Sequence, residues 1–375
     1  MRTGSIKRFE GKDTKSTVKQ KSWLNRIGYL LYNIKGVLAA GVGIYLFGLV
    51  PYILIRIVPY TIIRVLTAVG RLYYRFSPNK IKEVEMTKER FKKGVAVAVQ
   101  EYENYGSKIT KENLRGLLIG AQSPKNEYDF MLLMGSSYLI SRLDKKRNIL
   151  DAYSMLRIIE INDTPPPPHN YIVIFPAIGG KPWENKTGSD WGDYPETVLG
   201  ISALQREAAD KLNRLMKKYA KKHKMSLEKV KSESKIMVAG FSHGGINAAY
   251  FAENYSFEYN ITQVYVAGAP IARVKIPSDI NVIAYENPKD PFNYLDGVIN
   301  PERHNWQTIK TKTPELDFNP WYNHNVVSYA NFGTTESHDL GNLNDFLGTN
   351  QKCHNYYYVN ESNVDPYVRP KMATR

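Results

Sequence analysis

The hydrophobic and polar positions between residues 171 and 290 follow two alternating patterns. Short apolar runs rich in β-branched residues, YIVIFP, KIMVAG, TQVYVAG and NVIAYE, predict buried strands. From about residue 195 to 222, apolar residues recur every three or four positions, which predicts a long amphipathic helix with a lysine-rich, solvated face. A second helix is expected over residues 245–255. Alternating strands and helices predict an α/β fold, a mostly parallel sheet flanked by helices, with functional groups at the carboxyl ends of its strands.

The rest of the chain gives a coarser picture. Residues 81–105 favour a helix, and residues 106–164 mix short apolar runs with charged turns, as expected for early elements of the same domain. The stretch TPPPPHN indicates a stiff surface crossing. We therefore expect two regions: a basic N-terminal region, residues 1–90, and a catalytic domain, residues 91–375, with its core at about 165–350.

The N-terminal region contains an apolar run long enough for a membrane. Residues 37–55, VLAAGVGIYLFGLVPYILI, are 19 consecutive uncharged residues, and a helix needs about 20 residues to cross the hydrocarbon core. The following stretch, residues 56–75, places arginines at roughly helical spacings among isoleucines, valines and tyrosines, which indicates an interfacial segment. Residues 28–75 are thus expected to bind a membrane, with the protein integral to it.

Charge leaves the membrane topology open. Residues 1–90 carry 17 Lys and Arg against 5 Asp and Glu, so that +12 of the formal +15 lies there. Both flanks of the apolar run are basic, so the positive-inside rule does not choose a side, and a re-entrant hairpin fits as well as a span. The alternative is a hydrophobic helix pair buried against the catalytic domain.

The same distribution bears on partners and cofactors. Residues 91–375 carry a charge of only +3, which argues against a nucleic-acid-binding catalytic face. The single cysteine, Cys353, excludes an internal disulfide framework and a cysteine-based metal cluster.

A candidate catalytic motif lies in AGFSHGGINAAYF, where Gly240, Ser242 and Gly244 form the pattern G-x-S-x-G. An apolar strand precedes the turn and a helix follows it, as a nucleophile elbow requires. Glycines on both sides remove the Cβ atoms that would collide across so tight a turn. Ser242 is the candidate nucleophile, and the alternative is a strand-to-helix turn with an exposed serine.

A serine nucleophile needs a histidine base and a carboxylate that orients the histidine. Asp290, just past the strand NVIAYE, is the preferred acid, with Glu286 and Asp296 as alternatives. His338, in a polar loop that leads toward a final helix, is the preferred base, with His324 as the alternative.

The developing oxyanion needs two backbone N–H donors. One is expected from His243, the residue after the nucleophile. The other is expected from Ala177 or Ile178, at the end of the strand in YIVIFPAIGG.

Residues 171–345 resemble the α/β-hydrolase superfamily, and most closely its lipase class 3 branch. The resemblance rests on IVIFPAIGG, on SDWGDYP with Asp190 and Trp191, and on GFSHGG, VAGAPIA and ENPKDPF. Two departures are FPAIGG, where the branch has Arg-Gly-Thr, and Phe241 beside the serine. The resemblance implies hydrolysis of acyl esters through an acyl-serine intermediate, without a metal or an organic cofactor.

Together with a membrane-binding N-terminus, the resemblance favours a lipase or phospholipase acting on a lipid or another acyl ester. Two other interpretations stay open. One is a membrane-tethered thioesterase or small-ester hydrolase, and the other is a non-catalytic binding protein that retains the fold.

Overall fold

The structure is a computed structural model that describes residues 81–83, 85–104, 106–120, 123–135, 140–143, 149–153, 156–162, 169–177, 197, 200, 202–295, 303–312, 320–332, 343, 345–347 and 352–360. The expected membrane-binding segment, residues 28–75, lies outside this part of the chain. None of the helices within the described ranges has both the length and the apolar character that a bilayer crossing needs.

The described part of the chain forms a mixed sheet of eight strands in the order β1-β10-β4-β5-β6-β7-β8-β9. The strands are β1 (Ile81–Glu83), β4 (Leu156–Asn162), β5 (Asn170–Phe175), β6 (Ile236–Phe241), β7 (Ile261–Ala267), β8 (Asn281–Glu286), β9 (Trp306–Lys310) and β10 (Lys352–Asn360). Strands β5 to β9 run parallel to one another, whereas β4, β10 and β1 pair antiparallel. Strands β2 (Ile140–Leu143) and β3 (Ile149–Tyr153) form a separate antiparallel pair.

One face of the sheet is covered by α8 (Ala203–His223) and α10 (His243–Tyr255). Alternate strand residues point toward these helices, and the long apolar stripe of α8 packs on them, as its three- and four-residue spacing predicts. The short helix α9 (Leu227–Glu233) leads from α8 into β6. The predicted helices over about 195–222 and 245–255 are therefore present, with shifted boundaries.

The other face is covered by α4 (Lys88–Asn104), α6 (Glu127–Gly135) and α12 (Val326–Phe332), which share a second buried apolar cluster with the sheet. Between them lie α5 (Lys111–Arg115) and a π-helical turn, η2 (Gly116–Gly120). Helices on both faces confirm the expected α/β fold. The sheet extends beyond the expected core at about 165–350, because β1, β4 and β10 belong to it.

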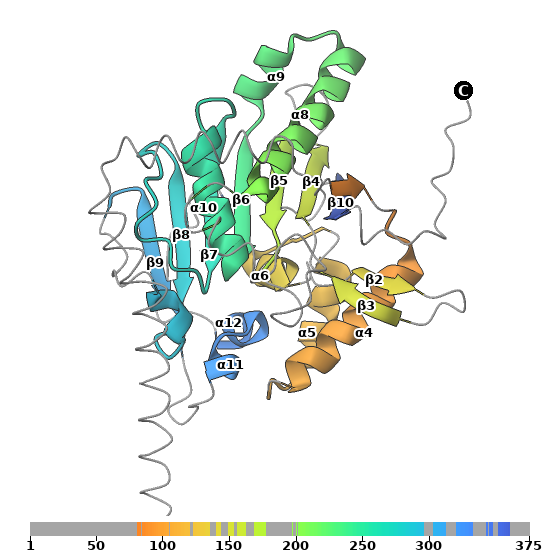
Figure 1. Ribbon diagram of the computed structural model, residues 1–375, viewed down its shortest axis with the longest axis vertical. Coiled ribbons are helices and arrows are strands. Elements are labelled where there is room, and N and C mark those ends of the chain that lie inside the picture. The colour runs from red at the N-terminus through yellow and green to blue at the C-terminus, as the bar shows by residue number, and fades with distance from the viewer. Residues whose placement is uncertain are drawn as a thin grey trace, which may run out of the picture.

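Figure 1 shows which elements lie at each end of the sheet. The helix α11 (Pro320–Asn323) and α12 lie beyond the carboxyl ends of the parallel strands, and α9 lies at the opposite end. A 3-10 turn, η4 (Pro291–Tyr294), follows β8 at the carboxyl end. We call the end with α11, α12 and η4 the carboxyl end of the sheet, and the end with α9 the far end.

Candidate active site

The candidate nucleophile lies in a strained turn. Strand β6 ends at Phe241, α10 begins at His243, and Ser242 between them has φ 54° and ψ −127°. A positive φ is costly for a residue with a Cβ atom, and such strain concentrates at functional sites. The Ser242 side chain makes no capping hydrogen bond to α10, although serine is a favoured N-cap residue. Its Oγ is directed to another partner.

Close packing at the glycines holds this turn in place. A Cβ atom on Gly244 would lie 2.3 Å from the carbonyl oxygen of Phe175 and 2.8 Å from that of Pro176. The first turn of α10 therefore lies directly against the end of β5, where only a glycine fits. This approach brings the start of α10 beside the segment that contains Ala177.

The partner of Ser242 is His324. Its Nε2 lies 2.7 Å from the Ser242 Oγ, and its Nδ1 lies 2.7 Å from the Asp290 Oδ2. The imidazole ring is 10% exposed, and the Asp290 side chain is fully buried. The three side chains form one hydrogen-bonded series that runs from a buried carboxylate to a partly exposed hydroxyl.

The structure thus reverses the order of preference between the two histidines. His324, the alternative in the sequence analysis, occupies the position that a base for Ser242 must take. His338 lies outside the described residues. His324 follows the four-residue helix α11, and the backbone carbonyl of Asn323 accepts a hydrogen bond from the Asn287 Nδ2 at 2.9 Å. That bond ties the histidine segment to the end of β8.

Asp290 is held by its own loop. It is the N-cap of η4, and its Oδ1 accepts a hydrogen bond from the Phe292 N–H at 2.9 Å. Its Oδ2 faces His324. The alternative acid Glu286 is the last residue of β8, and the other alternative, Asp296, lies outside the described residues. Of the two candidates that the structure describes, Asp290 is the one that lies against the histidine.

Tyr329 also contacts the acid, and sequence reasoning missed it. The Tyr329 hydroxyl donates to the Asp290 Oδ2 at 2.7 Å and accepts from the Asn293 Nδ2 at 3.0 Å. Burial, and then the neighbouring Asp290 charge, raise the pKa of Tyr329 well above its ordinary value. The phenol therefore stays protonated and acts as a donor. In the sequence VVSYANF, nothing distinguishes this tyrosine from an ordinary core residue.

Aromatic rings fix the plane of the imidazole. The rings of Phe292 and Phe241 lie with their centroids 4.2 Å and 5.0 Å from that of His324, at 33° and 32° to its plane. Phe241 therefore contributes to the site, because it directly precedes the nucleophile and its ring packs on the His324 ring. The sequence showed this residue only as a departure from the lipase pattern.

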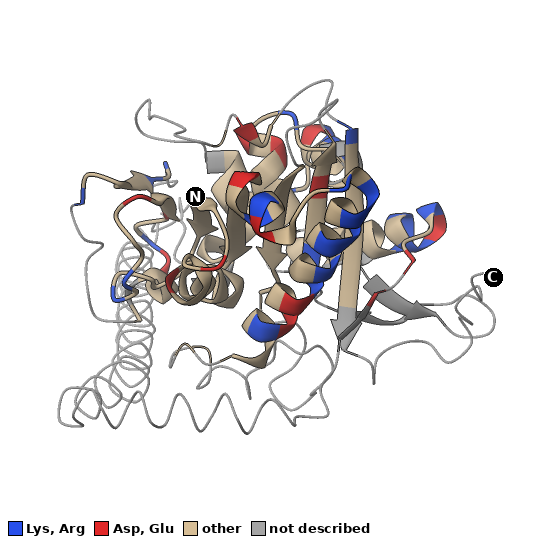
Figure 2. Ribbon diagram, turned by 90° about the horizontal axis from the view of Figure 1, so that it is seen from above, with Lys and Arg blue, Asp and Glu red and all other residues tan. Residues whose placement is uncertain are grey.

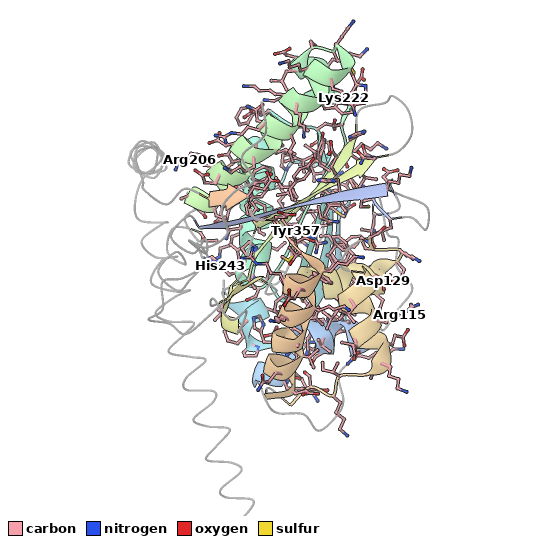
Figure 3. The ribbon with its side chains drawn as sticks, turned by 90° about the vertical axis from the view of Figure 1, so that its right-hand side faces the viewer. Arg115, Asp129, Arg206, Lys222, His243 and Tyr357 are labelled. Atoms are coloured by element: carbon pink, nitrogen blue, oxygen red, sulfur yellow. The ribbon has the colours of Figure 1, made fainter. Side chains whose placement is uncertain are left out.

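The oxyanion candidates lie where the strand ends meet the helix. His243 is the first residue of α10, and the N–H groups of a first helical turn have no partner within the helix. Burial lowers the pKa of the His243 ring to about 3, so the ring is neutral and adds no charge at the site. Ala177 is buried just past β5, and Ile178 lies outside the described residues. Figure 3 shows His243 well separated from Lys222 at the end of α8.

Among the described residues, no group of three His, Cys, Asp or Glu side chains could hold a metal ion. The geometry suits proton transfer from a hydroxyl to an imidazole that a carboxylate orients. No protein-family model matches the chain, and no curated protein matches it either.

Proposed function

We propose that this protein is a membrane-associated serine hydrolase of the α/β-hydrolase type, which cleaves acyl esters as a lipase or phospholipase does. The observation that carries the proposal is the series Asp290, His324 and Ser242, with both hydrogen-bond distances at 2.7 Å. The serine, acid and histidine follow β6, β8 and β9 in that chain order, which is the order of α/β-hydrolases. The strained backbone of Ser242 supports the same conclusion.

The reaction follows from the geometry. His324 Nε2 takes the proton of the Ser242 hydroxyl while its Oγ attacks the ester carbonyl carbon, and Asp290 stabilises the resulting imidazolium. The N–H of His243, with that of Ala177 or Ile178, stabilises the oxyanion. His324 then gives the proton to the leaving alkoxide oxygen, so that an alcohol leaves and an acyl-serine remains. Water, activated by the same imidazole, hydrolyses the acyl-serine to the free acid and restores the serine.

The membrane part of the proposal rests on sequence. The uncharged run at residues 37–55 and the arginine-bearing stretch after it provide an anchor. An anchored hydrolase meets lipid esters at high local concentration, which supports a lipid substrate over a soluble one. The whole chain should resist extraction from membranes by high salt, because burial of apolar residues is insensitive to charge screening.

The experiment is fluorophosphonate labelling together with hydrolysis of a short soluble ester, on the full chain. Ser242→Ala should abolish labelling and lower hydrolysis by about a thousandfold or more, as loss of a triad nucleophile does. The control is Ser232→Ala, which removes an exposed serine hydroxyl on α9. Labelling that persists in Ser242→Ala would refute the proposal and favour a binding protein with the same fold.

A further inference from the structure

The pairing of the first described strand shows where the N-terminal region joins the sheet. Strand β1 pairs with β10 at the edge, with Ile81 opposite Asn360 and Glu83 opposite Tyr358. On the other side of β10, Tyr358 lies opposite Leu156 of β4. Glu83 and Leu156 therefore lie at the same height along the strand direction.

The register continues across the sheet to the nucleophile strand. Arg157 lies opposite Ile174 in the antiparallel pair of β4 and β5, so that the preceding residue, Leu156, is level with Phe175. Phe175 in turn lies opposite Gly240 of β6. Glu83 and Gly240 are thus level with each other, four strands apart.

Ile81 lies two residues from Glu83, and Ser242 lies two residues from Gly240, both in the direction of the carboxyl end. Ile81 and Ser242 are therefore also level with each other. Strand β1 runs away from that end, so that β1 begins with Ile81 at the height of the nucleophile. Four strand spacings of ~4.8 Å place the two points roughly 19 Å apart across the sheet. The first described strand therefore begins at the carboxyl end of the sheet and not at the far end.

The connection is too short to reach around the domain. The expected membrane-binding segment ends at Arg75, six residues before Ile81. Six fully extended residues span at most about 21 Å. The helix α8, which has 21 residues and leads from the carboxyl end to the far end, is about 32 Å long at ~1.5 Å per residue. A membrane bound by residues 28–75 therefore cannot lie beyond the far end.

The far end exposes charged residues and one large apolar side chain, Phe257. The end of α8, with α9 after it, exposes charges of both signs (Lys221, Lys222, Lys224, Glu228, Lys229 and Glu233). Figure 2, seen from above this end, shows blue and red residues interspersed there. Because lysines outnumber glutamates, these charges do not exclude an anionic lipid surface, and the short connection to Ile81 is what argues against a membrane at the far end.

We propose that the carboxyl end of the sheet faces the membrane that residues 28–75 bind, and that the substrate is an acyl-ester lipid of that same membrane. The inference rests on the proposed function and adds to it the side from which substrate enters. A lipid in another membrane, or an ester in solution, is then a poorer substrate than a lipid beside the anchor.

Energy transfer tests the orientation without using activity. In the full chain with Cys353→Ser, a donor dye is attached at Lys312→Cys, exposed after β9 at the carboxyl end, or at Phe257→Cys, exposed after α10 at the far end. The acceptor is a headgroup-labelled lipid in vesicles of equimolar phosphatidylcholine and phosphatidylserine. We expect about twice the transfer efficiency from residue 312, because the sheet separates the labels by on the order of 20 Å. Equal transfer, stronger transfer from residue 257, or no vesicle binding overturns the proposal.

A vesicle-mixing assay tests the substrate. The full chain is reconstituted either into vesicles that contain a quenched fluorescent phospholipid or into plain vesicles that are then mixed with substrate vesicles. We expect hydrolysis about tenfold faster or more in the first case, since the anchor raises the local substrate concentration. Equal rates would overturn the inference while leaving the hydrolase proposal intact. A failure of Ser242→Ala to reduce turnover of a short soluble ester would instead overturn the hydrolase proposal itself.

Discussion

Replacing Tyr329 by Phe removes one oxygen atom from behind the candidate triad. The Tyr329 hydroxyl donates to the same Asp290 oxygen that faces His324, and both Tyr329 and Asp290 are almost completely buried. A phenylalanine ring fills the same volume without the donor. The change therefore separates the role of this hydrogen bond from the role of the ring in packing.

The size of the effect follows from the charge on the acceptor. A hydrogen bond to a charged group contributes about 1.5–3 kcal/mol, and about 1.4 kcal/mol corresponds to a factor of ten. Asp290 keeps the Phe292 N–H and His324 as partners, so that the lower half of this range applies. We expect kcat/KM to fall roughly 13- to 40-fold, which corresponds to about 1.5–2.2 kcal/mol.

The pH profile gives the specific readout. With one donor fewer, the negative charge on Asp290 is less dispersed, so that Asp290 and His324 together hold a proton more tightly. Since the base must be neutral to act, the acid limb of kcat/KM should move to higher pH. The measurement is hydrolysis of a short soluble ester from pH 5 to 9.

The matched control is Tyr356→Phe. Tyr356, on β10 and away from the triad, also donates to a carboxylate, that of the partly buried Glu160, at 2.9 Å. Both variants should lose about 1–2 kcal/mol of stability in denaturant unfolding, and only Tyr329→Phe should shift the acid limb. An unchanged acid limb in Tyr329→Phe, or an equal shift in both variants, would refute the positioning role of this hydroxyl.

Three further predictions concern the same site. His324→Ala should lose at least about a thousandfold in kcat, whereas His338→Ala should keep most of its activity; the reverse result in soluble-ester kinetics would restore the first preference from sequence. Gly244→Ala should destabilise the fold by about 1–3 kcal/mol in denaturant unfolding, because its Cβ atom would lie 2.3 Å from the Phe175 carbonyl oxygen, and unchanged stability would contradict this packing. Burial lowers the pKa of His243 to about 3, whereas its pKa in the unfolded chain is about 6.5. The stability that depends on the neutral ring is therefore complete above about pH 6.5 and is lost as the pH falls toward 3. Wild type should therefore lose up to about 1.4 kcal/mol per pH unit more than His243→Gln between pH 6 and 4, and parallel stability curves would exclude this assignment.

The sequence predicts those parts of the site that depend on local pattern. An apolar run, a small-residue turn and a helix lie next to one another at Ser242, so that the elbow can be inferred from the sequence around it. Asp290 could be inferred in the same way, because an acid just past a buried strand lies at the carboxyl end of the sheet.

The parts that the sequence missed, or ranked second as it did His324, depend on contacts between distant segments. His324 follows a helix of only four residues, too short for a hydrophobic period to reveal, and its place is set by a bond from Asn287 to the Asn323 carbonyl. Tyr329 looks like any apolar-face residue until the fold brings it to Asp290. The pairing of β1 with β10 joins segments about 270 residues apart, and the local sequence of either strand does not predict which residues pair.

The position of β10 also has a consequence for biosynthesis. Strand β10, the last of the described chain, lies between β4 and β1, which the ribosome makes about 190 and 270 residues earlier. Ser242, Asp290 and His324 are all synthesised before β10, so that the catalytic residues emerge while one edge of β4 is still unpaired. An open edge can pair with other chains, and partly made domains are prone to such association. A nascent chain halted shortly before residue 352 should therefore aggregate or recruit chaperones, although it already contains the whole triad.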